Sequence, residues 1–134
     1  MRLRDLSRCF VPGLFVISMQ AIASEEQQVR NLVALGGLAF ADNCQHCHQI
    51  DGYGEAPLYP SLRDEALLAN RALLVNTVLH GRFAKEQDGT RSEPLMPSLS
   101  FLSNREVAAI IAFITNTWGP EVLVVSEQEV ADAR

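Results

Sequence analysis

The sequence is poor in cysteine, in aromatic side chains and in positive charge. Three cysteines in 134 residues exclude the framework of several disulfide bonds that stabilises many small secreted proteins. A formal net charge of −5 is unsuited to nucleic acid, which binds basic surfaces. The chain also lacks internal repeats and low-complexity tracts. With 48% apolar and 20% charged residues, we expect one globular domain.

Long apolar runs are also lacking, except near the start of the chain. Residues 9–19 form an apolar run after three arginines, and this run is shorter than the roughly 20 residues of a membrane-spanning helix. Small residues follow at Ala21 and Ala23. The pattern is typical of a secretory signal peptide, so we expect residues 1–23 to be cleaved near Ala23 after export to the periplasm. An uncleaved membrane anchor is the alternative.

Cleavage would leave residues 24–134 as the folded domain, with no membrane span and with only two cysteines, Cys44 and Cys47. Because residues 1–23 hold three arginines and one aspartate, the remainder has a formal net charge of −7. This acidic surface either docks on a basic patch of a partner protein or simply keeps the protein soluble.

Apolar residues recur at helical spacing in three parts of the chain. The first helix is predicted from residue 29 up to the cysteines, after a polar and frayed segment at residues 24–30. Gly36 and Gly37 lie inside this helix and disfavour it, which indicates the close approach of another helix.

The other two helices have clear start and stop signals. Asn70 can cap a helix that ends at Gly81, where a C-cap glycine is expected. Ser103 and Glu106 form a capping box that begins the last helix, and Gly119-Pro120 ends it.

The segments between these helices are expected to be mostly loop. A loop is predicted over residues 49–60 and a short turn over 64–69, and a polar loop over 82–99 contains Met96. The C-terminal tail, residues 121–134, begins with a short β-branched run and ends in a helical turn capped by Ser126. Helices without a series of alternating strands predict an all-α fold.

The chemistry of the chain is concentrated in Cys44-Gln45-His46-Cys47-His48. Two thiols one helical turn apart suit addition to the two vinyl groups of one porphyrin, and the adjacent histidine reaches the iron. We therefore predict one covalently bound haem c on Cys44 and Cys47, with His48 as an axial ligand and His46 as a solvent-facing spacer. Haem would also fill the core, which three helices alone would leave thin.

Two other kinds of site compete with this prediction. A thioredoxin-like dithiol would need a strand before the motif and a parallel sheet, and the sequence indicates neither. A zinc site would have to find its fourth ligand in the distant His80 or in a carboxylate.

The second axial ligand is predicted by elimination. Met96 is the only methionine after residue 23, and it lies beside Pro97 outside any helical apolar stripe. A thioether is a good ligand for the iron of an electron carrier. His80 is the rival ligand, but its position at a helix end favours a histidine whose ring is satisfied by a hydrogen bond or exposed to solvent.

These residues and their spacing resemble the class I cytochrome c family over most of residues 36–119. Gly36 and Phe40 stand eight and four residues before Cys44, as in the family's first helix. Pro60 and Leu62 match the family's Pro-X-Leu element after the haem-binding histidine. The resemblance implies a class I cytochrome c fold in which the N- and C-terminal helices cross and the haem lies in the core. It also implies that the Pro60 carbonyl accepts a hydrogen bond from His48.

Other segments are similar to bacterial members of this family, namely Leu79-His80-Gly81, Met96-Pro97 and the last helix up to Trp118. The ending Asn116-Thr117-Trp118-Gly119, with the later Val130 and Arg134, is similar to cytochrome subunits of membrane-associated alcohol and sugar dehydrogenases. Pro120 departs from the asparagine expected there.

The resemblance and the ligand set imply a monohaem carrier of single electrons, not itself an enzyme. Its expected partners are a periplasmic dehydrogenase as donor and a terminal oxidase or reductase as acceptor. One alternative is a fixed cytochrome subunit of a dehydrogenase complex, with residues 121–134 folding against a partner. Another is a haem enzyme or gas sensor in which Met96 is displaced easily from the iron.

Overall fold

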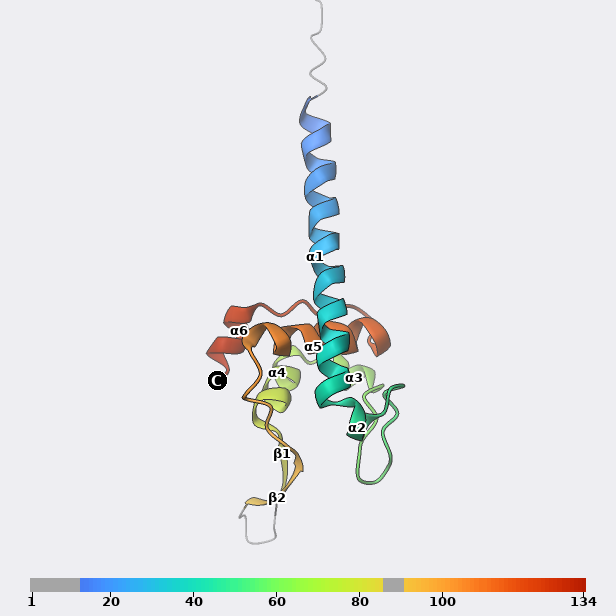
Figure 1. Ribbon diagram of the computed structural model, residues 1–134, viewed down its shortest axis with the longest axis vertical. Helices are drawn as coiled ribbons and strands as arrows, with labels where there is room; N and C mark the ends of the chain where they lie inside the picture. The colour runs from blue at the N-terminus through green and yellow to red at the C-terminus, as the bar shows by residue number, and fades with distance from the viewer. Residues whose placement is uncertain (1–12, 86–90) are drawn as a thin grey trace, which may run out of the picture.

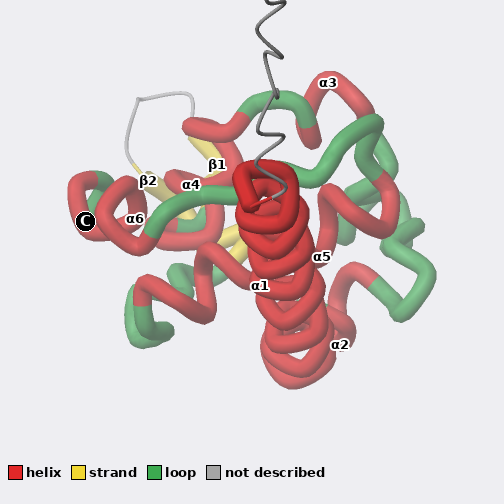
Figure 2. Tube along the Cα trace, turned by 90° about the horizontal axis from the view of Figure 1, so that it is seen from above, coloured by secondary structure: helices red, strands yellow, loops and turns green. Residues whose placement is uncertain are grey.

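A computed structural model describes residues 13–85 and 91–134 as a mostly helical fold. The elements in chain order are α1 (Gly13–Asn43), α2 (Gln45–His48), α3 (Glu65–Leu68), α4 (Arg71–His80), β1 (Arg82–Lys85), β2 (Arg91–Met96), α5 (Asn104–Trp118) and α6 (Glu127–Asp132). Helix α1 projects from the body of the molecule, and α5 crosses the lower half of α1 (Figure 1). Seen along α1, α6 and the strands lie on one side of it (Figure 2).

The crossing of α1 and α5 is the centre of the fold. A Cβ atom at Gly36 would collide with the backbone carbonyl of Ala109 and lie 2.7 Å from Cβ of Phe113. Only glycine therefore allows this approach. One turn further along α1, the buried ring of Phe40 contacts the rings of Phe113 and Trp118, with centroids 5.3 and 5.5 Å apart. The predicted approach of a second helix to the paired glycines is confirmed.

Helix α1 begins much earlier than the sequence pattern predicted. Residues 24–30, expected to be frayed, are helical and mostly exposed, and they lie where α1 leaves the body (Figure 1). Glutamate, glutamine and arginine in this segment have good intrinsic helix propensity, so the helix forms here without an apolar stripe. Residues 1–12 of the predicted signal peptide lie outside the described residues. Among the helices that are described, none has the length and apolar character needed to span a membrane.

The predicted caps of α4 and α5 are present. The Asn70 side chain accepts a hydrogen bond of 3.0 Å from the backbone N–H of Leu73. Ser103 and Glu106 form the full capping box at the start of α5. Gly81 follows α4 with φ of 70°, a conformation that favours glycine. The short turn predicted before α4 is α3, in which the N–H of Leu67 donates to the Asp64 side chain.

The predicted loop over residues 82–99 is wrong in its first part. Strands β1 and β2 pair antiparallel, with Arg82 opposite Met96 and Phe83 opposite Pro94. Irregular register separates these pairs, and the strands are short. The many polar residues and Pro94 hid the strand pattern, although the Asp88-Gly89 dipeptide between the strands is a common hairpin sequence. The fold class is unchanged, because this two-stranded ribbon is the one sheet in the described part of the chain.

The tail, residues 121–134, packs across the chain's own domain, and we call it the C-terminal strap. Val125 and Val130 are buried in the core, and Arg71 of α4 forms an ion pair of 2.9 Å with Glu129. The residues between α5 and Ser126 belong to neither a helix nor a sheet. Ser126 begins α6 with a second capping box, so the predicted helical turn is confirmed. The structure therefore shows a tail that folds on its own domain and not one that needs a partner protein in order to fold.

One buried hydroxyl group joins the strap to α5. Thr115 Oγ1 donates to the carbonyl of Ile111 at 2.7 Å and accepts from the backbone N–H of Leu123 at 3.0 Å. In a Thr115→Val variant the shape is kept but the N–H of Leu123 loses its partner. We expect the free energy of unfolding of the holoprotein in denaturant to fall by about 2 kcal/mol. Thr117→Val is the control, because its exposed hydroxyl only bonds the carbonyl of Phe113. Equal effects of the two changes would contradict the expectation.

The strap is also expected to weaken in acid. The pKa of Glu129 is lowered from its ordinary value of 4.5 by hydrogen bonds from the Ser126 backbone and hydroxyl and from Arg71. A lowered pKa in the folded state means that this contribution to stability is complete above 4.5 and is lost as the pH falls through the folded value. We expect a Glu129→Gln variant to lose less stability than the wild type when the pH is lowered below 4.5, in denaturant titrations at several pH values. Glu127→Gln makes the same charge change in the same turn and should follow the wild type.

Candidate functional site

The pentapeptide Cys44–His48 lies at the junction between α1 and α2, which is a single helical turn. The backbone N–H groups of Cys47 and His48 both bond to the carbonyl of Cys44, at 3.2 and 2.9 Å. This turn places the two cysteines one helical turn apart. Both are free thiols; Cys44 is buried and Cys47 is half-buried. Because a helix precedes the motif, the strand that a thioredoxin-like site requires is missing.

The surroundings of Cys44 favour an uncharged sulfur. Burial, and to a lesser extent the neighbouring Cys47, raises the pKa of its thiol to about 11. Zinc would require thiolates, which this environment disfavours. The described residues also contain no group of three or more cysteine, histidine or carboxylate side chains placed to hold a metal ion. A neutral thioether bond to a porphyrin suits the position better.

His48 is held in one orientation by a proline carbonyl. Its Nδ1 atom lies 3.1 Å from the carbonyl oxygen of Pro60. A carbonyl can only accept, so Nδ1 carries the proton and Nε2 keeps its lone pair. Within the described residues Nε2 makes no hydrogen bond. Burial lowers the pKa of His48, partly opposed by the bond to Pro60, so the ring is neutral at pH 7 and ready to bind a metal through Nε2.

The loop that carries Pro60 is itself fixed to the motif. The N–H of Gly54 donates to the carbonyl of His48 at 3.0 Å, and Leu62 donates to Gly52 at 2.8 Å. The Arg63 guanidinium donates to the Asp51 carbonyl at 2.8 Å and stacks 4.1 Å above the ring of Tyr53. Nothing local in the sequence indicates this role of Arg63, because its contacts reach across ten or more residues.

Met96 is the last residue of β2. Its side chain is half-buried and packs against the hydrophobic core. Its backbone carbonyl approaches Gly81 so closely that any Cβ there would collide with it. Strand pairing and this close contact fix Met96 more firmly than the loop predicted from the sequence.

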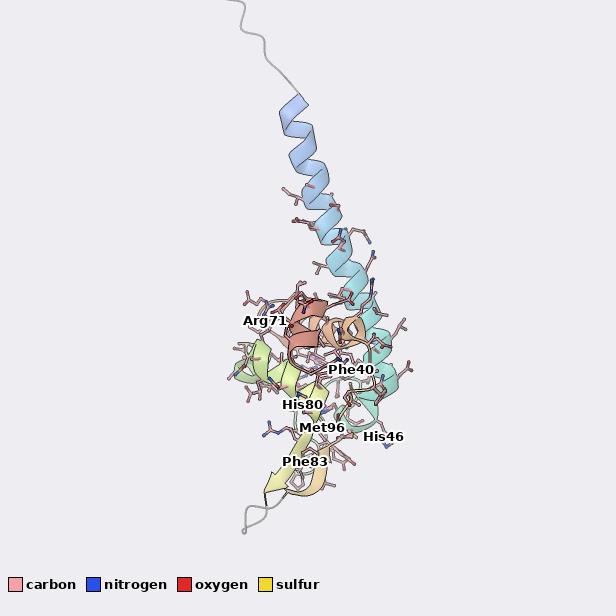
Figure 3. All side chains as sticks on the ribbon, turned by 90° about the vertical axis from the view of Figure 1, so that its left-hand side faces the viewer. Phe40, His46, Arg71, His80, Phe83 and Met96 are labelled. Atoms are coloured by element: carbon pink, nitrogen blue, oxygen red, sulfur yellow. The ribbon has the colours of Figure 1, made fainter. Side chains whose placement is uncertain are left out.

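The other two histidines, His46 and His80, have exposed side chains and surroundings different from those of His48. His46 is exposed, as expected of a spacer residue (Figure 3). His80 is exposed and donates from Nε2 to the carbonyl of Ala133 at 2.8 Å. The prediction that the His80 ring is hydrogen-bonded or exposed agrees with this bond, which engages one of its two ring nitrogens.

Two free thiols one helical turn apart and an oriented imidazole beside them suit the covalent attachment of haem c, and a half-buried thioether lies in the same domain. Residues 33–118 match the cytochrome c family. The chain therefore belongs to the cytochrome c family, has its all-α class I fold, binds haem c covalently and carries electrons. The predicted family, fold class and cofactor are confirmed.

Relatives from three bacteria agree with this assignment. The chain is 30% identical over 99 residues to the cytochrome c subunit of the quinone alcohol dehydrogenase of Gluconacetobacter polyoxogenes, covering 66% of this chain and 21% of that subunit. The corresponding subunit from Komagataeibacter europaeus aligns to the same extent. Cytochrome c-552 of Thermus thermophilus is 31% identical over 99 residues, covering 63% of this chain and 67% of the relative. The chain thus spans about a fifth of the length of the dehydrogenase subunits.

Proposed function

We propose that Cys44 and Cys47 attach one haem and that His48 and Met96 are its axial ligands, which makes the chain a monohaem carrier of single electrons. The observation that carries the proposal is the hydrogen bond from His48 to Pro60, because it leaves Nε2 oriented and deprotonated. When bound, haem c supplies an iron centre that exchanges one electron at a time.

The residues around the motif are suited to keeping both ligands in place. His48 is buried and fixed by Pro60, and the Arg63 contacts fix the loop from which Pro60 comes. Met96 is fixed by strand pairing and by the approach to Gly81. Two firm protein ligands leave no open position on the metal, so a carrier is favoured over a haem enzyme or gas sensor.

The proposed setting is the periplasm, after removal of residues 1–23. A periplasmic dehydrogenase is the proposed donor and a terminal oxidase or reductase the proposed acceptor. Two observations support redox partners of this kind: the similarity to quinone alcohol dehydrogenase subunits and the excess of acidic over basic residues, which suits a basic partner surface. A fixed subunit of a dehydrogenase complex remains the second candidate, on the strength of the same similarity.

Spectroscopy of the purified wild-type holoprotein tests the ligand set. We expect a near-infrared sulfur-to-iron band in the ferric state and no binding of carbon monoxide to the ferrous state at neutral pH. A ferric spectrum without this band, together with carbon monoxide binding, would sink the proposal in favour of a sensor or enzyme. Size-exclusion chromatography of the native periplasmic extract then separates a free carrier from a subunit of a larger complex.

A further inference from the structure

The segment that follows Met96 is bonded to the C-terminal end of α4. We call residues 96–102 the Met96 loop. The Ser98 hydroxyl donates to the carbonyl of Leu79 at 2.5 Å, and the N–H of Leu99 donates to the carbonyl of Val78 at 3.0 Å. These bonds secure the middle of the loop to the body of the protein.

The far end of the Met96 loop is held by the last residue of the C-terminal strap. The Arg134 guanidinium donates to the carbonyls of Ser100 and Leu102 at 2.7 and 2.6 Å, and to Oδ1 of Asn104 at 2.7 Å. Charged donors make hydrogen bonds about twice as strong as neutral ones, and a planar guanidinium can reach three acceptors at once. One side chain therefore closes the end of the loop against the start of α5.

The strap is in turn bound to the body at points independent of Arg134. Val130 is completely buried, and Glu129 is paired with Arg71 at the start of α4. At the other end of α4, His80 donates to Ala133, next to Arg134. Figure 3 shows Arg71, His80 and Met96 following one another down the same side of the molecule. The strap therefore holds the Arg134 guanidinium in a fixed position.

We propose that Arg134 is a positioning residue that holds the Met96 loop closed and so limits how readily Met96 leaves the iron. The inference rests on the proposed ligation by Met96. Opening of the loop breaks the bonds from Arg134 to Ser100 and Leu102, so these bonds favour the closed, ligated state. Their loss shifts the balance toward the open state without removing any part of the ligand itself.

Imidazole is a suitable probe, because it replaces the methionine sulfur only when the loop opens. Binding of imidazole to the ferric holoprotein is followed by the loss of the near-infrared band. We expect Arg134→Ala to raise the apparent association constant about tenfold, which corresponds to about 1.4 kcal/mol. Arg134→Lys keeps the charge but not the planar fork, and a smaller rise is expected. Arg105→Ala removes a positive charge from the exposed side of α5, and we expect the wild-type constant.

The possible results separate this inference from the proposed function. If the wild type shows the band but Arg134→Ala binds imidazole as the wild type does, the inference is overturned. An equal rise in Arg105→Ala would also overturn it, because the effect would then be one of net charge. A wild type without the band contradicts ligation by Met96 itself. Denaturant unfolding of each variant is measured in parallel. A tenfold rise in the association constant, with a loss of less than about 1.4 kcal/mol in the free energy of unfolding, supports local positioning.

Discussion

A Met96→Ala variant is expected to lose the near-infrared band completely and to bind carbon monoxide in the ferrous state. Met96 is the only methionine after residue 23, so no other thioether within residues 24–134 can take its place. Removal of the side chain opens a coordination position, and the reduction potential is expected to fall, because a methionine ligand raises it. Absorption spectra of both oxidation states and a redox titration measure these effects.

Leu95→Ala is the matched control for this substitution. Leu95 is the neighbouring residue in β2, and 63% of its surface is exposed. Its loss should leave the band, the potential and the lack of carbon monoxide binding unchanged. A Met96→Ala protein that still excludes carbon monoxide would show that another side chain binds the iron.

A Gly36→Ala variant is expected to lose about 3 kcal/mol of stability, close to the upper end for overpacked cores. The added methyl group would meet the Ala109 backbone carbonyl, and a backbone cannot rotate away as a side chain can. The two helices must therefore separate along the centre of the core. Denaturant unfolding of the holoprotein, followed by the circular dichroism of its helices, measures the loss.

Gly37→Ala provides the control one residue further along α1. There an added Cβ would lie 3.3 Å from the ring edge of Phe113, which can shift slightly. Alanine gains up to about 1 kcal/mol of helix propensity over glycine, so stability should stay the same or rise. Equal losses in the two variants would show that the crossing does not depend on the missing side chain at Gly36.

Much of the fold follows from signals that lie close together in the sequence. The five residues Cys44–His48 identify the cofactor because every chemical group needed for attachment is local. Asn70 and Ser103 cap their helices through bonds that span three residues, so the starts of α4 and α5 are visible without any tertiary information. The crossing was also predicted, because Gly36 costs helix stability and needs a compensating contact.

The contacts that fix the ligand loop were not predictable in the same way. Arg134 is 34 residues from Ser100, and His80 is 53 residues from Ala133. No periodicity or propensity relates residues at such separations, and each bond depends on the whole fold being in place. For the same reason the sequence could not decide whether residues 121–134 fold on their own domain or only on a partner. The hairpin is likewise hard to recognise, because its short strands contain many polar residues.

The backbone contact at Gly36 also has a consequence for the rate of folding. It joins helices near opposite ends of the domain, so most of the chain must form a closed loop before this contact gives any stabilisation. Contacts between distant parts of a chain are reached slowly for this reason. We therefore expect the meeting of α1 and α5 to limit refolding, with the Met96 loop settling afterwards. Trp118, whose ring contacts Phe40 across this junction, is the natural fluorescent reporter for the step in stopped-flow experiments.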